Sequence, residues 1–279
     1  MNLDKKVPLV SIIVPFYNHN KFIKQTLDSF LEDSYPNKEI IIINDGSTEL
    51  QDDNIINWID LHSKHIKINY IKRKNEGVTK TINQLISMSN GEYILPCSSD
   101  DYFINNTIQS RIDLLSENKN KEIIIGDCII VDNDNKLLFK SNLFECRNHK
   151  LEEYMTDFGL ATMIIKKWSM AGPSWLAKKS LFDKIGLFDE NLIVEDWDFM
   201  LRVVSQNLAI FYPDKPVSAY RLHGNNTINN PEKQIRMWED LYRTAKKHIK
   251  SFNNLYFKYL MWNNSKKNLK KLNELRKMN

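Results

Sequence analysis

The chain has 279 residues, enough for one large domain or for a domain plus an appendage, and its 42% hydrophobic and 27% charged residues are ordinary for a soluble globular protein. Its net charge of +4 is uneven, because residues from Lys246 onward hold nine Lys, one Arg and one Glu, which leaves +9 on the tail and −5 on the remainder. Three cysteines without a CxxC pair, no apolar leader and no apolar run of membrane-spanning length exclude a disulfide framework and a membrane span, and predict a cytoplasmic protein.

The first half of the chain alternates between two periodicities. Short, β-branched and nearly continuous apolar segments predict strands covered on both faces, at residues 9–15, 39–45, 66–71, 92–96 and 122–131. Residues 21–31 and 78–88 place their apolar side chains at helical spacing. This alternation predicts an α/β fold with a mostly parallel sheet flanked by helices.

Ligands of such sheets bind beyond the carboxyl ends of the strands. The predicted strand ends are aromatic, acidic, basic and doubly acidic in turn, at residues 15–18, 44–47, 72–75 and 98–101. Each one alone is best explained as a polar turn, but four such clusters on one rim favour a ligand site.

Four motifs carry a family resemblance: VSIIVPFYN (10–18), IIINDGST (41–48), NEGVTKTIN (75–83) and GEYILPCSSDD (91–101). In this order and spacing they resemble the GT-A glycosyltransferases, in particular the family-two group of inverting enzymes. The resemblance continues through 172–204 and 220–227. It implies a GT-A domain over 1–228, with a nucleotide-binding half (8–101) and an acceptor-side half (102–228), followed by a basic helical extension (229–279).

The resemblance assigns the donor nucleotide to the first three rim segments. Pro15, Phe16 and Tyr17 are expected at the base, where an aromatic face can stack on uracil. Asp45 is expected to accept the N3–H of uracil, although Asp45-Gly46 also suits a tight turn.

The amides that follow Gly77 at the start of helix 78–88 favour a diphosphate. Lys74 and Lys80 are candidate phosphate contacts, although loop lysines are usually only solvated. Asn83 matches an Asn common in the family, but a place on the helix surface suits it equally well.

The resemblance makes Asp100 and Asp101 the ligands of Mg²⁺ or Mn²⁺, because two adjacent carboxylates suit a hard cation that also binds phosphate oxygens. The family pattern is Asp-x-Asp-Asp, and here Ser98 replaces the first Asp. Ser98 is expected to reach a ribose hydroxyl, and Asp100 is also a candidate nucleotide contact. His223, in YRLHGNNT, is a further candidate for binding the metal or contacting phosphate, although a lone His is more often structural.

An inverting transfer needs a general base on the acceptor side, and the family places it on Asp196 of VEDWDFMLR. Glu195 is expected to orient the loop or the acceptor. Asp198 and Arg202 suit a surface ion pair. All three acids could instead only stabilise the start of the following helix.

Gly172, Trp175 and Arg221 match family positions near the acceptor or donor sugar. Trp175 could stack on a pyranose ring, although Trp is more often a core residue.

Residues 232–279 predict a helical tail that mixes aromatic and basic side chains. Two interpretations remain open: contact with an anionic membrane surface, or packing on the domain or on a second subunit of a homo-oligomer. No nucleic-acid partner is expected.

Together these features predict a metal-dependent glycosyltransferase that uses a nucleotide sugar, with UDP favoured, and a saccharide or lipid-linked acceptor. The alternative is a degenerate module that binds a nucleotide sugar without transfer, as Ser98 suggests. A nucleotidyltransferase is disfavoured, because VPFYNHNKF is not a Gly-rich phosphate loop.

Overall fold

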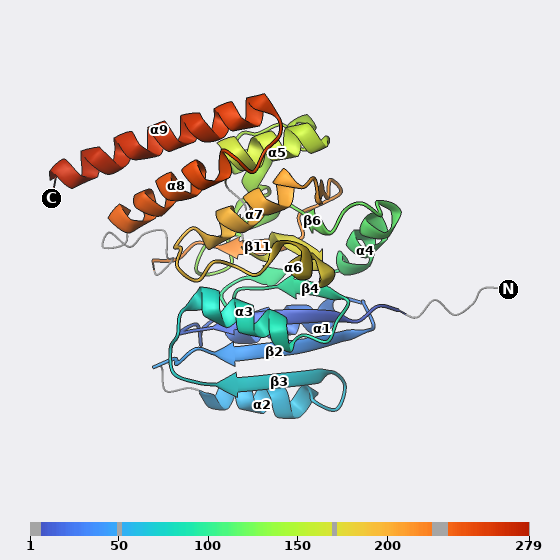
Figure 1. Cartoon of the computed structure of the whole chain (residues 1–279). Coiled ribbons are helices and arrows are strands. Elements are labelled where there is room, and N and C mark those ends of the chain that lie inside the picture. The colour runs from blue at the N-terminus through green and yellow to red at the C-terminus, as the bar shows by residue number, and fades with distance from the viewer. Residues whose placement is uncertain (1–6, 49–51, 169–171, 225–233, 279) are drawn as a thin grey trace.

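The computed structural model describes residues 7–48, 52–168, 172–224 and 234–278. A seven-stranded sheet forms its centre (Figure 1). Its strands lie in the order β10 (Ala209–Phe211), β6 (Ile123–Ile125), β9 (Trp175–Lys178), β4 (Tyr93–Pro96), β1 (Val10–Phe16), β2 (Lys38–Asn44) and β3 (Lys67–Lys72). Strand β1 runs parallel to β2 and β4, and β2 runs parallel to β3, whereas β9 is antiparallel to both of its neighbours. The predicted mostly parallel sheet is confirmed.

Successive apolar residues of β1 and β2 face opposite sides, so both faces of the sheet need helices. Ile12 and Ile40 pack toward α1 (Ile23–Glu32), α2 (Asp52–His62) and α4 (Ile108–Glu117). Ile13 and Ile41 belong to a second cluster, formed with α3 (Val78–Met88), α5 (Asp157–Lys166), α6 (Ser180–Ile185) and α7 (Glu195–Ser205). Continuous apolar strands therefore reflect a sheet buried on both sides.

A second sheet, which the sequence did not predict, orders β5 (Tyr102–Phe103), β11 (Ser218–Arg221), β7 (Cys128–Val131) and β8 (Leu137–Phe139). Our prediction of one strand over 122–131 is wrong, because this segment divides into β6 and β7, which lie in different sheets. A Cβ at Gly126 would come within 2.8 Å of Val217, and the Asp127 carboxylate accepts the Leu143 N–H at 3.0 Å. Gly126 therefore passes close to Val217, and Asp127 ties the chain between β6 and β7 to the segment Asn142–Cys146.

Three short helical segments, η1 (Asn142–Cys146), η2 (Leu151–Glu153) and η3 (Gly172–Ser174), connect these elements. The tail forms two helices, α8 (Gln234–His248) and α9 (Leu255–Met278), which pack side by side at the end of the molecule opposite β3 and α2 (Figure 1). The predicted helix over 232–279 is thus interrupted, and residues 232, 233 and 279 lie outside the described residues.

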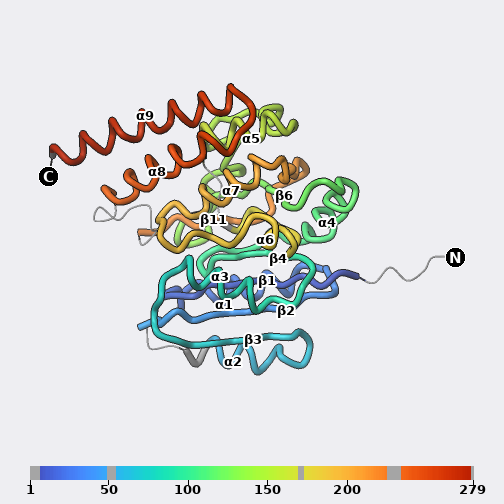
Figure 2. The backbone as a smooth tube through the Cα atoms, viewed as in Figure 1, coloured from blue at the N-terminus to red at the C-terminus, as the bar shows by residue number. Residues whose placement is uncertain are grey.

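Phe252 in the interruption and Phe257, Leu260 and Met261 of α9 belong to the hydrophobic cluster of α5 and α7. The tail therefore shares its core with the domain, as the packing interpretation expects. Figure 2 follows the chain from the sheet that carries the first strands to this tail. Within the described ranges, no helix is both long enough and apolar enough to cross a membrane.

Candidate active site

The loops after β1, β2 and β3 are tied to one another at the carboxyl rim of the sheet. Asp45 is buried, and its carboxylate accepts the backbone N–H of Glu76 at 3.0 Å and of Gly77 at 2.9 Å. Arg73 forms an ion pair with the same carboxylate at 3.1 Å. Asp45 thus positions the start of α3, and its contact with a base stays a prediction.

Gly46 is required by this arrangement. Its φ of +79° lies in the left-handed region, and a Cβ there would come within 2.6 Å of the Asn75 backbone nitrogen. Across the rim, the Asn18 N–H donates to Ser47 Oγ at 2.9 Å. Hydrogen bonds therefore link the three loops to one another at the rim.

Of the residues predicted at the base, Phe16 is fully buried in the core beneath the rim, Pro15 is partly buried, and Tyr17 is 44% exposed. Of these three residues, Tyr17 is therefore the one whose aromatic ring is exposed and available to stack on a base.

The basic residues near α3 differ in their surroundings. Lys74 is exposed, and Lys80 forms an ion pair with Glu76 at 3.0 Å. Asn83 is buried rather than on the surface: its side-chain amide donates to Phe188 O and Glu190 Oε1, both at 2.9 Å. Because both amide hydrogens are used, the geometry favours a positioning role for Asn83.

Residues 98–101, the donor turn, follow β4 and are held from two sides. Thr26 Oγ1 of α1 donates to Ser99 O at 3.0 Å and to Asp101 O at 2.6 Å. Arg221 of β11 is buried, and its Nε donates to Asp100 O at 2.8 Å. Ser98 is partly buried.

The other guanidinium donors of Arg221 bind Asp132 O and Gln25 Oε1, and the group lies 4.6 Å from the Phe22 ring centre. We predicted that Arg221 lies near a sugar. The geometry instead makes it a buried support of the donor turn.

The two aspartates of the turn have different environments. Asp101 is 1% exposed, and its Oδ1 accepts the Arg221 N–H at 2.8 Å. Burial and the neighbouring charge of Asp100 raise the pKa of Asp101 well above its usual value. Asp101 thus faces the protein interior, and its predicted role as a metal ligand has no support in this geometry.

Asp100 instead faces two histidines. His223 Nε2 lies 2.9 Å from Asp100 Oδ2, and His19 Nδ1 lies 3.6 Å from Asp100 Oδ1. Among the described residues these three form a group of potential metal ligands whose atoms all lie within 4.8 Å of one another. We call it the His–Asp–His cluster. It brings the predicted pair of Asp100 and His223 together and adds His19.

Glu195 and Asp196 begin α7, whose free N–H groups favour negative charge. Asp196 accepts hydrogen bonds from its neighbour Trp197 N at 2.6 Å and from Trp168 Nε1 at 3.1 Å. The Asp196 residue as a whole is exposed, but the protein around its carboxyl group reduces the hydration of that group. This desolvation raises the pKa of Asp196.

Glu195 is partly buried, and burial together with the charge of Asp196 raises its pKa to about 8. Its carboxyl accepts a hydrogen bond from Thr79 on α3. The N-termini of α3 and α7 therefore meet, and the predicted donor and acceptor halves adjoin at this contact.

Asp198 is a structural residue, as predicted, but its ion pair is buried and not on the surface. Its carboxylate binds Arg202 Nε at 3.0 Å, Lys247 Nζ at 2.9 Å and His248 Nε2 at 2.8 Å. Burial acts to raise its pKa, but these cationic and hydrogen-bonding partners hold the pKa well below its usual value. This network joins α7 to the tail helix α8.

Trp175 is 6% exposed and packs among the rings of Phe182, Phe188 and Phe199, so its position is that of a core residue. Gly172 begins η3, next to residues 169–171, which are not described. Their sugar contacts stay predictions, and for Trp175 burial argues against one.

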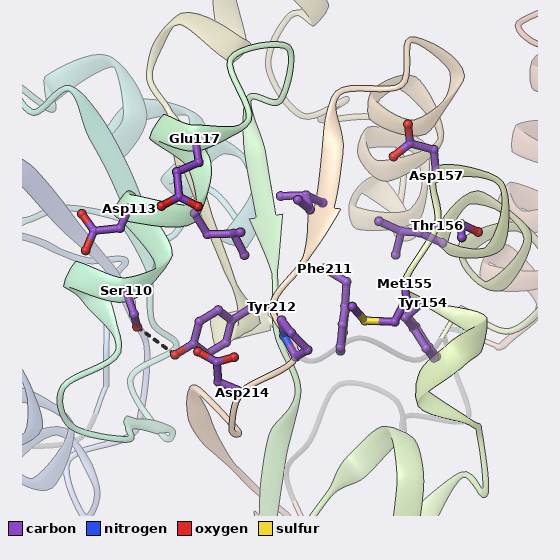
Figure 3. A pocket seen from close by; sticks show the side chains of 14 residues that line it. Ser110, Asp113, Glu117, Tyr154, Met155, Thr156, Asp157, Phe211, Tyr212 and Asp214 are labelled. Carbon is purple, nitrogen blue, oxygen red and sulfur yellow. Dashed lines mark hydrogen bonds between the residues drawn. The ribbon is translucent and has the colours of Figure 1, made fainter.

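A recess of about 330 Å³ lies elsewhere, between α4, β10 and the residues that precede α5. Figure 3 shows Asp113 and Glu117 on one side, Thr156 and Asp157 on the other, and Phe211 and Tyr212 between them. No predicted site residue lines it, so it is separate from the rim.

The sequence interpretation missed His19, Thr79 and Trp168. A signal existed for His19: it follows β1, and β1 is the parallel neighbour of β4, which precedes the donor turn. Residues that follow adjacent parallel strands meet at one rim. Trp168 and Thr79 gave no comparable signal, because their contacts with Asp196 and Glu195 depend on how distant helices pack.

Comparison with known proteins is consistent with this geometry. A profile of glycosyl transferase family 2 matches residues 11–186. An uncharacterized glycosyltransferase of Rickettsia typhi is 30% identical over 238 residues, which cover 84% of this chain and 70% of the relative.

Two solved structures are similar in fold. S. aureus TarS 1-349 in complex with UDP-GlcNAc has a TM-score of 0.69 at 18% identity, with 93% of this chain and 71% of TarS 1-349 covered. The mannosyltransferase PcManGT from Pyrobaculum calidifontis in complex with GDP-Man and Mn²⁺ has a TM-score of 0.68 at 18% identity, with 94% and 70% covered. The expected GT-A fold is confirmed.

Proposed function

Because the chain belongs to glycosyl transferase family 2, we propose that it transfers a hexose or N-acetylhexosamine, with inversion, from a UDP-sugar to an acceptor hydroxyl. The acceptor is a growing glycan or a lipid-linked saccharide, as in polysaccharide biosynthesis. The observation that carries this proposal is the His–Asp–His cluster beyond the carboxyl ends of the strands. The acid pair at the N-terminus of α7, where Glu195 accepts a hydrogen bond from Thr79 of α3, offers the candidate general base.

The donor side supplies binding groups for a nucleoside diphosphate. Tyr17 offers an exposed ring for the base, and the α3 N-terminus, fixed by Asp45, offers backbone N–H groups for phosphate. TarS binds UDP-GlcNAc and PcManGT binds GDP-Man, which supports a nucleotide-sugar donor here.

Asp100 and His223 have the donor types and spacing to hold Mn²⁺ or Mg²⁺. A divalent cation bound there would neutralise the charge that develops on the diphosphate leaving group. PcManGT, whose structure contains Mn²⁺, supports this assignment by analogy of fold.

On the acceptor side, Asp196 takes the proton of the attacking hydroxyl. The acceptor oxygen bonds to the anomeric carbon from the face opposite the diphosphate, and the bond from that carbon to the diphosphate oxygen breaks. The hydrogen bonds from Trp168 and Trp197 fix the Asp196 carboxyl, and its raised pKa makes it a better proton acceptor. Glu195, largely protonated at neutral pH, donates a hydrogen bond that orients the acceptor.

The test is a panel of UDP-sugars assayed with Mn²⁺ for transfer and for slow hydrolysis, with wild type, Asp100→Asn and Asp196→Asn. Loss of turnover in both variants is expected. Full turnover in both variants would refute the mechanism. Nucleotide binding by calorimetry without any product would favour the non-catalytic binding module.

The tail offers a surface suited to an acidic lipid membrane. Leu255 is 80% exposed, Tyr259 55% and Trp262 48%, and Phe158 of α5, 52% exposed, stacks on Tyr256 at 5.5 Å. Positive charge surrounds these rings, and Lys266 Nζ lies 5.7 Å from the Trp262 ring. Aromatic and basic side chains together bind anionic interfaces, and like charge disfavours pairing of two such tails. We therefore place the enzyme in the cytoplasm, peripheral to the inner face of the membrane.

A further inference from the structure

The His–Asp–His cluster is assembled from three distant parts of the chain. His19 follows β1, Asp100 follows β4 and His223 follows β11. The imidazoles of His19 and His223 lie edge to face with ring centres 5.5 Å apart, and the carboxylate of Asp100 lies within reach of both. This convergence is a property of the tertiary fold, because His19 and His223 are 204 positions apart in the sequence.

The spacing suits one metal ion. Bonds of roughly 2.0–2.2 Å from a cation to N and O ligands place neighbouring ligand atoms about 3–4 Å apart. The separations of 2.9 Å and 3.6 Å between Asp100 oxygens and the two ring nitrogens fall near this range. His19 Nδ1 also lies 2.9 Å from Ser99 Oγ, so metal binding through Nδ1 would replace that hydrogen bond.

The cluster is also held in place before any ion binds. Thr26 and Arg221 fix the backbone of the donor turn on either side of the Asp100 carboxylate. The Phe22 ring packs against His19 at 6.3 Å and against His223 at 5.4 Å. Supports of this kind orient metal ligands and reduce the reorganisation that binding requires.

From this donor set we infer that His19 is a third metal ligand, and that two imidazoles with one carboxylate make the site select a transition-metal dication, Mn²⁺ or Co²⁺, over Mg²⁺. Imidazole nitrogen favours first-row transition metals, whereas Mg²⁺ prefers oxygen donors. Ser98 supplies no carboxylate that would reverse this preference. The inference rests on the proposed function for the chemical role of the ion. The identity of the metal ligands and the metal preference do not depend on that function.

The experiment measures metal binding by the purified full chain with no nucleotide present. Pulsed EPR of bound Mn²⁺ detects the nitrogen of each coordinated imidazole. We expect two coupled imidazoles in wild type, one in His19→Gln, and two in the control His65→Gln, since His65 is an exposed residue of the loop before β3. One imidazole or none in wild type would overturn the inference whether or not the variant folds.

Titration with Co²⁺, followed by its visible absorption, gives the affinity. His19→Gln should weaken Co²⁺ binding by about tenfold or more, and His65→Gln should leave it unchanged. Displacement of Co²⁺ from wild type should require about 100-fold more Mg²⁺ than Co²⁺. Displacement by equimolar Mg²⁺, or unchanged affinity in His19→Gln, would contradict the assignment.

His19→Asp separates a ligand from a merely structural residue. It should retain a metal site with one coupled imidazole, and Mg²⁺ should compete better than in wild type. If His19 only supported Ser99, this variant would not change the metal preference, which would refute the inference.

The two proposals fail separately. Two coupled imidazoles in a chain that transfers no sugar would refute the proposed function and leave the metal site intact. Sugar transfer by a chain that binds no Mn²⁺ would refute the metal site and leave the proposed transfer reaction intact.

Discussion

The donor turn and the segment that carries the acid pair, residues 193–198, are held in place by different parts of the chain. The turn is fixed by α1 and β11, both of which belong to the sheet-bearing body. The acid segment is fixed by the tail: Asp240 of α8 accepts the Ile193 N–H at 3.0 Å, and Asp198 binds Lys247 and His248.

The family match includes the turn but ends at residue 186, before the acid segment. The match therefore includes Asp100 but not Arg221, His223 or the acid pair, all of which lie beyond residue 186. The acid segment depends on tail helices that also lie outside the matched region.

The largest expected effect is on chemistry at the acid segment. Asp196→Asn should lower turnover roughly 10²–10⁴-fold, the usual contribution of a general base, with nucleotide affinity nearly unchanged. Steady-state assays and calorimetry measure the two quantities. The control is Asp183→Asn, an exposed residue of α6. If Asp196→Asn lost nucleotide binding instead, Asp196 would belong to the donor side. The contrast between the donor turn and the acid segment would then be wrong.

Asp198→Ala should destabilise the fold and separate the tail from α7. Removing one partner of a buried charge network costs about 3–5 kcal/mol, or a melting-temperature decrease of roughly 6–20 °C. Thermal denaturation measures it, with the exposed Asp113→Ala as the control. A decrease below about 2 °C would mean that the tail does not support the acid segment.

Glu195 should make stability depend on pH. Its folded-state pKa of about 8 lies above the ordinary 4.5, so between these values the unfolded chain is ionised while the folded chain retains the proton. Wild-type stability therefore falls as pH rises through this window, and Glu195→Gln removes the fall.

The melting-temperature advantage of Glu195→Gln should grow from pH 5 to pH 8 and then level off. The gain should be at least about 1 kcal/mol, or roughly 2–4 °C. A pH-independent difference between the two proteins would show that the Glu195 carboxyl titrates normally.

The smallest effect should be at the exposed aromatic surface of the tail, which we propose contacts an anionic membrane. Trp262→Glu should reduce co-sedimentation with phosphatidylglycerol vesicles severalfold and leave turnover on a soluble acceptor unchanged. Leu61→Glu, at a residue of α2 that is 68% exposed and distant from the tail, is the matched control. Equal loss in both variants, or wild-type dimers in light scattering, would assign the aromatic surface to another partner.

The sequence predicted what depends on local periodicity. Helix 78–88 is confirmed at its predicted bounds, because its apolar side chains repeat at 3.6-residue spacing between Gly77 and Ser89. The division of 122–131 into two strands was not predictable, since the close packing of Gly126 against Val217 joins residues that are 91 positions apart in the sequence.

The candidate site shows the same limit. Residue types and their adjacency to strand or helix ends led us to predict Asp100, His223 and the acid pair as site residues, and their chemical roles stay predictions. Burial argues against the predicted sugar contacts of Arg221 and Trp175, because a cation or an indole in a motif does not reveal whether it faces solvent or the interior. His19 required knowledge of which strands are neighbours.

The ion-pair network between Asp198 and α8 limits where the chain can be truncated. A chain cut after residue 228 would retain every residue of the rim and of the acid pair. It would leave a buried carboxylate without Lys247 and His248, and it would expose apolar side chains of α5 that α9 covers, such as Phe158, on which Phe257 stacks. The tail is therefore not an exchangeable module. Grafting it onto a relative would require grafting α7, with its acids, as well.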